Sequence, residues 1–287
     1  MSKSYVADQT RAHGAALSVV KAALLTVALV ASLLFLPGRA NASVMAVSVP
    51  SSAKSGLALD ARLHRPSRGG RAPAVVLMHG CGGWQPAVMQ GLDSYANFLV
   101  RQGFVVLNLD SFGARGNGGG TVCKSLNRLS AARRYRTDDA YDAMRFLRAQ
   151  KFVDSNSIFL IGQSNGGSVA MIAAMEKTRR RQVGQETGFR GVVALYPWCG
   201  ATGSQRPTLS APLLILGGAL DDWVPPTGCQ RMSARGDDLK VRIYANAAHS
   251  FDVPIPVHRY LGNLVGYSPS AARDARNEIL QFFRAQM

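Results

Sequence analysis

Ser164 lies in a pattern that is typical of a nucleophilic serine. The apolar run 158–161 precedes it, and Asn165-Gly166-Gly167 begins an Ala-, Met- and Val-rich stretch after it. This arrangement predicts a buried strand that turns sharply into a helix at Gly-x-Ser-x-Gly, which raises the serine hydroxyl above the sheet edge. Gly162 and Gly166 remove side chains that would collide where strand and helix meet. An ordinary strand-to-helix turn is the alternative interpretation.

His249 and an aspartate of segment 217–226 are candidates to activate this serine. A serine hydroxyl is a weak nucleophile near neutral pH, so a base must accept its proton as it attacks a carbonyl. His249 follows the predicted strand at 239–245, and an imidazole can both accept and return a proton. A carboxylate must hold the other imidazole nitrogen. We expect Asp221 to do so, with the adjacent Asp222 capping the next helix.

Other polar residues at predicted strand ends are alternatives. Asp110 is a further candidate carboxylate, although a loop-capping role suits it better. His79 belongs to a His-Gly turn and is expected to brace that loop, and His258 lies in a Pro-rich segment.

An oxyanion hole needs two backbone N–H groups directed at the developing negative charge. The residue after the nucleophile, Asn165, is expected to supply one, and Cys81, in the loop after the strand at 73–80, the other. Gly82 is the alternative second donor. Three tryptophans also follow strand ends, and they either line the substrate pocket or shield nearby loops: Trp84, Trp198 and Trp223.

Apolar strands separated by helices must position these residues. This alternation predicts an α/β fold with a mainly parallel sheet covered by helices on both faces, whose site lies beyond the carboxyl ends of the strands. Segment 251–268 is expected to form a lid, a wall or an ordered connection. The expected strands are 57–63, 73–80, 104–110, 158–161, 191–197, 211–218 and 239–245. The expected helices are 92–102, 136–150 and 270–283, with a long loop at 111–129.

Residues 1–42 have the pattern of a secretory signal peptide. Basic residues precede an apolar run at 22–36, and Ala40-Asn41-Ala42 forms a small-x-small cleavage site before Ser43. A retained membrane anchor is the alternative, but the apolar run is short for a full span. We therefore expect a single mature domain, residues 43–287, in the periplasm or outside the cell.

All four cysteines lie in the mature segment, where disulfides are the default expectation. Their spacing argues against a zinc site, and no metal is expected. Three pairings are possible, and free thiols are the alternative. We favour Cys81 with Cys123 and Cys199 with Cys229, because each pair would join loops at the same end of consecutive strands.

The formal net charge is +16, and +13 for residues 43–287. This excess predicts electrostatic association with anionic cell-envelope surfaces. The arginines are scattered or in short groups, and no nucleic-acid-binding motif accompanies them. The group at 179–181 is expected at the C-terminal end of the helix that follows Ser164, where cations complement the helix dipole.

Five motifs follow the predicted strands: HGCGGW (79–84), DSFGARG (110–116), GQSNGG (162–167), GALDDWVPP (218–226) and NAAHSFD (246–252). Together they resemble the dienelactone hydrolase family of α/β-hydrolases. The resemblance covers residues 73–287 and implies an eight-stranded, mostly parallel sheet with a Ser/Cys-His-Asp site. The founding enzymes carry a cysteine nucleophile where this chain has Ser164, so dienelactone itself is doubtful as the substrate.

The expected function is therefore that of an exported serine hydrolase acting on small carboxylic esters or lactones without a cofactor. Two alternatives are a peptidase or amidase on the same fold and a noncatalytic exported protein that binds polyanions. No nucleic-acid partner is expected.

Overall fold

The computed structural model describes residues 43–235 and 238–287. The predicted signal peptide, residues 1–42, lies outside these ranges. None of the helices within them is long and apolar enough to cross a bilayer.

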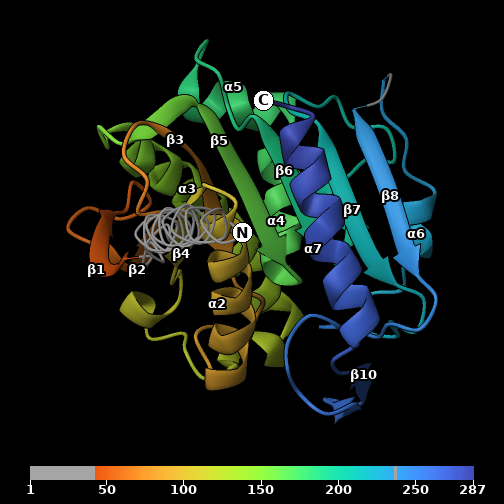
Figure 1. Cartoon of the computed structure of the whole chain (residues 1–287). Coiled ribbons are helices and arrows are strands. Elements are labelled where there is room, and N and C mark those ends of the chain that lie inside the picture. The colour runs from red at the N-terminus through yellow and green to blue at the C-terminus, as the bar shows by residue number, and fades with distance from the viewer. Residues whose placement is uncertain (1–42, 236–237) are drawn as a thin grey trace, which may run out of the picture. The chain divides into compact units, whose positions relative to one another are not determined.

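Eight strands form a single, mostly parallel sheet, as the sequence predicted (Figure 1). The spatial order is β1-β2-β4-β3-β5-β6-β7-β8. Strand β2 runs antiparallel to both of its neighbours, and the remaining pairs are parallel. The strands are β1 (Ser43–Pro50), β2 (Ala58–Arg65), β3 (Ala72–Met78), β4 (Val105–Leu109), β5 (Val153–Gln163), β6 (Gly191–Leu195), β7 (Leu213–Gly218) and β8 (Leu239–Tyr244).

Helices cover both faces of the sheet, with α2 (Pro86–Arg101) and α7 (Pro269–Arg284) on the near face in Figure 1. Helices α3 (Leu126–Arg148) and α4 (Asn165–Ala173) pack on the other face. Because successive strand residues point to opposite faces, Val75 and Leu77 of β3 pack with α2 and α7. Val76 and Met78 pack with α3 and α4. The central strands are thus buried on both faces, as parallel strands usually are.

The structure adds one strand, corrects one helix start and gives segment 251–268 a definite conformation. Strand β1 was not foreseen, and α3 begins ten residues before the expected 136, at Leu126, where the Ser125 side chain accepts the Arg128 N–H. The glycines at 113–120 concealed this helix start, because they made the whole stretch read as a loop. Segment 251–268 contains a short antiparallel hairpin, β9 (His258–Tyr260) and β10 (Asn263–Val265).

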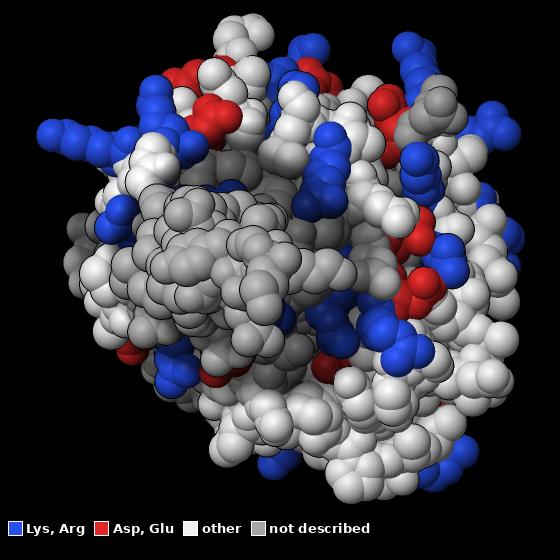
Figure 2. All heavy atoms as spheres, in the orientation of Figure 1, with Lys and Arg blue, Asp and Glu red and all other residues white. Residues whose placement is uncertain are grey.

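Some of the arginines in the described residues pair with acidic side chains. Figure 2 shows Lys and Arg side chains spread over several parts of the visible face rather than gathered in one patch. The arginines at 179–181 do not end the helix after Ser164, because α4 ends at Ala173. They lie instead on a separate helix, α5 (Glu176–Val183), where Glu176 pairs with Arg179 at 2.7 Å and Arg180 at 2.6 Å.

Candidate active site

Ser164 lies in a strained turn between β5 and α4. Its φ is +52°, in the region that side chains other than glycine rarely adopt. The turn is tight enough that a Cβ at Gly162 would overlap the Gly166 carbonyl, and one at Gly166 would lie 2.5 Å from the His79 carbonyl oxygen. The two glycines therefore permit the close approach that the sequence predicted.

Ser164, His249 and Asp221 form a continuous chain of hydrogen-bond contacts. The Ser164 Oγ lies 2.8 Å from His249 Nε2, and His249 Nδ1 lies 2.7 Å from Asp221 Oδ2. The three residues come from the ends of β5, the loop after β7 and the loop after β8. The arrangement allows the histidine to accept the serine proton while the aspartate holds its other nitrogen.

The backbone fixes the Asp221 carboxylate. Its Oδ1 accepts the N–H groups of Trp223, at 3.0 Å, and Val224, at 2.9 Å, so Oδ2 remains directed at His249. Asp222 does not cap the next helix as expected. Its side chain faces the β9–β10 hairpin, where it accepts the Leu264 N–H at 2.6 Å and pairs with Arg259 at 2.9 Å.

Two aromatic rings enclose the His249 imidazole, which is 2% exposed. The Tyr196 ring contacts it edge-on, with centroids 4.8 Å apart, and the Trp223 ring lies at 5.1 Å. These contacts restrict rotation of the imidazole, so it stays aligned between Ser164 and Asp221.

A buried carboxylate next to this site was missed by the sequence analysis. Asp252 accepts hydrogen bonds from Tyr196 Oη and from Gln163 Nε2, the latter at 2.9 Å. Burial raises the pKa of Asp252. Its position three residues after His249 was the available signal, but only the fold shows that it supports Tyr196, which contacts the imidazole.

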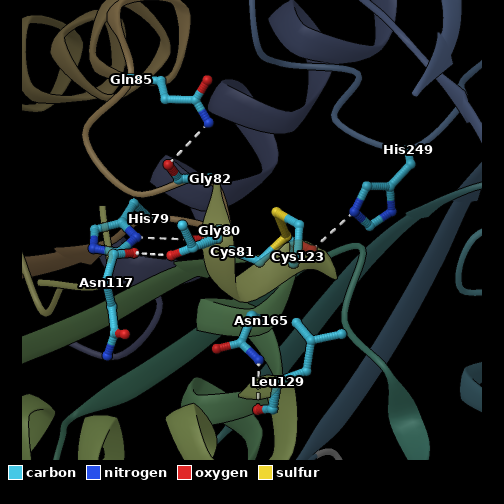
Figure 3. Close-up of a disulfide and its surroundings, with 12 residues drawn as sticks. His79, Gly80, Cys81, Gly82, Gln85, Asn117, Cys123, Leu129, Asn165 and His249 are labelled. Atoms are coloured by element: carbon cyan, nitrogen blue, oxygen red, sulfur yellow. Dashed lines mark hydrogen bonds between the residues drawn. A yellow bond between two sulfur atoms is a disulfide. The ribbon is translucent and has the colours of Figure 1, made fainter. Parts of the chain in front are cut away.

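The loop after β3 passes directly beside Ser164. A Cβ at Gly80 would lie 3.3 Å from the Ser164 Cβ, so the backbone of residues 79–81 borders the hydroxyl. Figure 3 shows Cys81 of this loop near Asn165 and His249. Among the described residues, neither the Cys81 nor the Asn165 backbone N–H has a protein acceptor. Both are therefore available to an oxygen bound near Ser164.

His79 braces this loop, as the sequence suggested. It is fully buried, its Nδ1 donates to the Gly80 carbonyl at 2.7 Å, and its Nε2 accepts the Ser111 N–H at 3.2 Å. Burial, and then the Arg136 guanidinium, lower the pKa of His79, which keeps it neutral. Asp110 caps the neighbouring loop by accepting the N–H groups of Phe112 and Gly113.

Two disulfides lie at this end of the sheet, and they have the pairings favoured from the sequence. Cys81 is joined to Cys123, and Cys199 to Cys229. The first disulfide ties the loop beside Ser164 to the segment that precedes α3 (Figure 3). It therefore anchors one of the two candidate oxyanion donors.

Two cavities meet at Ser164 and His249. The hairpin cavity, about 300 Å³, is walled by Val88, Val253, Ile255 and Tyr260, and the α3 cavity, about 470 Å³, by Leu126, Leu129, Arg133 and Trp198. Trp223 lines both, so it stands at their boundary.

The three tryptophans therefore differ. Trp223 and Trp198 line the cavities, and Trp198 lies under the Arg133 guanidinium. Trp84 lines neither cavity, and the centre of its ring lies 5.6 Å from Arg62 Cζ.

Backbone strain is concentrated at the hairpin cavity. Among the described residues, four other than glycine have positive φ, and three of them line this cavity: Ser164, Tyr196 and Ser250. Such conformations are costly and cluster where a fold holds groups in place for function.

The sheet, its helices and the position of Ser164 define an α/β-hydrolase fold. A model of the dienelactone hydrolase family matches residues 59–287. The chain belongs to this family, and it is a hydrolase that acts on a small-molecule substrate. None of the curated proteins matches it.

Solved structures share the fold at low identity. A putative dienelactone hydrolase from Klebsiella pneumoniae is 17% identical, with a TM-score of 0.63 over 84% of this chain and 99% of that one. An esterase from Pyrobaculum calidifontis is 18% identical, with a TM-score of 0.54 over 85% of each chain. A putative dipeptidyl aminopeptidase IV from Bacteroides ovatus is 16% identical, with a TM-score of 0.61 over 88% of this chain and 37% of that one.

Proposed function

We propose that the protein is an exported serine hydrolase that cleaves carboxylic esters or lactones through an acyl-enzyme intermediate. The observation that carries this proposal is the contact chain from Ser164 Oγ through His249 to Asp221, at 2.8 and 2.7 Å. Membership of a hydrolase family supports it further.

The first half-reaction transfers the acyl group to Ser164. As Oγ attacks the carbonyl carbon, its proton passes to His249 Nε2, and Asp221 stabilises the imidazolium. The carbonyl oxygen becomes an oxyanion that accepts the N–H groups of Cys81 and Asn165. Collapse of this intermediate breaks the bond to the alcohol oxygen, which leaves with the proton from His249.

The second half-reaction releases the acid. Water gives a proton to His249 Nε2 and attacks the acyl carbon, and the bond to Ser164 Oγ breaks as the histidine returns the proton to it. The two cavities on either side of Trp223 provide separate places for the acyl and alcohol parts of an ester.

A peptidase or amidase on the same fold is the second candidate, and the likeness to the dipeptidyl aminopeptidase structure favours it as the alternative. The test compares kcat/KM for p-nitrophenyl butyrate with that for alanine p-nitroanilide, using residues 43–287. We expect the ester to be preferred by at least about 10³-fold. A preference for the anilide would contradict the ester assignment.

The noncatalytic binding alternative is less well supported. A polyanion-binding surface would benefit from gathered cations, whereas several arginines here pair with acidic residues, as Arg242 does with Asp274 and Glu278. This alternative also gives no reason for the strained Ser164 turn beside two cavities.

Export is part of the proposal, because residues 1–42 have a signal-peptide pattern and two disulfides suit an oxidising compartment. We expect the mass of protein recovered from the periplasm or medium of a bacterial host to correspond to residues 43–287. A full-length chain retained in the membrane fraction would contradict cleavage after Ala42.

Loss of the Cys81–Cys123 disulfide is expected to reduce turnover as well as stability. The disulfides span 42 and 30 residues, so each stabilises the fold by about 4 kcal/mol in the chain-entropy account. Replacing Cys81 and Cys123 with alanine keeps the Cys81 backbone N–H but releases its loop. We expect kcat of the folded enzyme to fall about tenfold, part of the effect of losing an oxyanion donor.

The matched control replaces Cys199 and Cys229 with alanine. This variant should lose similar stability in thermal unfolding. Its kcat, normalised to titrated active sites, should stay within about twofold of the parent, since neither cysteine lines the hairpin cavity or the α3 cavity. Equal kcat in the two variants would show that the first disulfide has no special role at the site.

A further inference from the structure

Arg136 is a buried cation beneath the candidate oxyanion hole. It lies on α3, and its side chain is 0% exposed. Its Nη2 donates to the His79 carbonyl at 2.6 Å, and its Nη1 donates to the Asn165 side-chain Oδ1 at 2.8 Å. The guanidinium also lies 4.8 Å from the centre of the Phe112 ring. From the sequence, this residue was placed only at the start of the expected helix 136–150 and was given no role.

The environment of Arg136 is unusual for a buried charge. Buried ions are normally paired with an opposite charge, because removing them from water is costly. In the described part of the chain, however, Arg136 forms no salt bridge, and the nearby Asp139 carboxylate is held by both Nη atoms of Arg115, at 2.9 and 2.8 Å. Burial lowers the pKa of Arg136 to about 10, so it remains charged at neutral pH.

The two acceptors of Arg136 belong to the two segments that carry the oxyanion donors. His79 lies two residues before Cys81 in the loop after β3, whereas Asn165 begins α4. His79 and Asn165 are 86 residues apart in the chain, and one rigid guanidinium is hydrogen-bonded to both. The Asn165 side chain cannot easily turn away, because its Nδ2 donates to the Leu129 carbonyl at 3.1 Å.

We propose that Arg136 is a positioning residue that holds the Cys81 and Asn165 N–H groups at the separation needed to bind one oxyanion. The inference rests on the proposed function. A guanidinium suits this role because its planar fork fixes the directions of two hydrogen bonds, which a lysine ammonium cannot do. Its positive charge, in a site shielded from water, also favours negative charge on the oxygen above it.

The test measures kcat, KM and inhibition by a boronic acid in Arg136→Lys, normalised to titrated active sites. We expect kcat to fall about 10²-fold, comparable to removal of one oxyanion donor, while KM changes less than about threefold. Affinity for the boronic acid, whose tetrahedral adduct places an oxygen in the hole, should fall with kcat. A purely structural role would lower the folded fraction but not the kcat of titrated sites.

Two further variants keep the inference testable if Arg136→Lys folds poorly. Asn165→Ala retains the backbone N–H but removes one Arg136 acceptor, so we expect kcat to fall at least about tenfold. The kcat of the double variant, Arg136→Lys with Asn165→Ala, should lie within about threefold of the kcat of Arg136→Lys alone, because both changes break the same link. Arg115→Lys is the matched control: it alters a neighbouring guanidinium that contacts neither segment, and its kcat should be unchanged.

Three results would each overturn the inference while leaving the proposed function intact. They are a wild-type kcat in titrated Arg136→Lys, an unchanged affinity of that variant for the boronic acid, and an equal loss of kcat in Arg115→Lys. Failure of the wild-type enzyme to hydrolyse esters or to react with a fluorophosphonate would instead overturn the proposed function and this inference with it.

Discussion

Replacing Ser164 with alanine is expected to reduce kcat for ester hydrolysis by about a millionfold, the scale found when a catalytic serine is removed. Alanine keeps the Cβ and can occupy the same turn, but no oxygen then faces His249 Nε2, which lies 2.8 Å from Oγ. The measurement is ester turnover together with covalent labelling by a fluorophosphonate probe. Both should disappear, and the thermal unfolding midpoint should change little.

Ser210→Ala is the matched control for this prediction. The Ser210 hydroxyl donates to the Ala174 carbonyl just beyond the far end of α4, away from both cavities. Its loss should leave labelling and kcat unchanged. Labelling that persists in Ser164→Ala would show that another residue is the nucleophile, and the proposed mechanism would then fail.

Replacing Asp221 with asparagine is expected to lower kcat by about 10⁴-fold with little change in KM. The carboxylate accepts a hydrogen bond from His249 Nδ1 at 2.7 Å, which leaves Nε2 unprotonated toward Ser164. The amide nitrogen of asparagine can donate to Nδ1 instead. It would thus favour the tautomer whose Nε2 carries a proton, and that tautomer cannot accept the serine proton.

The adjacent aspartate provides a matched control. Asp222→Asn makes the same chemical change one residue away, but Asp222 faces Arg259 and the Leu264 N–H rather than His249. We expect its kcat to remain within about threefold of wild type, since an exposed ion pair contributes little. A large loss in Asp222→Asn and a small one in Asp221→Asn would reverse the assignment.

Sequence patterns located the residues of the candidate site because each pattern is local. A glycine on either side of the serine, a His-Gly turn and a polar residue after each apolar strand are features of short segments, and parallel strands bring their carboxyl ends to one edge. Ser164, Asp221 and His249 therefore appeared as candidates, and the fold brings them within hydrogen-bonding distance.

The same local reasoning failed where two segments compete for one side chain. Asp222 was expected to cap the next helix, but the β9–β10 hairpin offers it the Leu264 N–H and Arg259. For Trp84 and Trp223, which both follow strand ends, the sequence left open whether they line the pocket, and of these two only Trp223 lines the cavities. Sequence position indicates the end of the sheet at which a residue lies, but packing decides which way its side chain points.

By itself, the sequence determined the α/β class, the edge of the sheet that carries the site and the residue types available there, because hydrophobic periodicity and turn residues encode these locally. Only the tertiary structure decided that Arg136, in a basic stretch of a helix, is buried between the His79 carbonyl and the Asn165 side chain. The physical reason is that burial of a charge depends on acceptors contributed by distant segments, and no periodicity in α3 records where those acceptors lie.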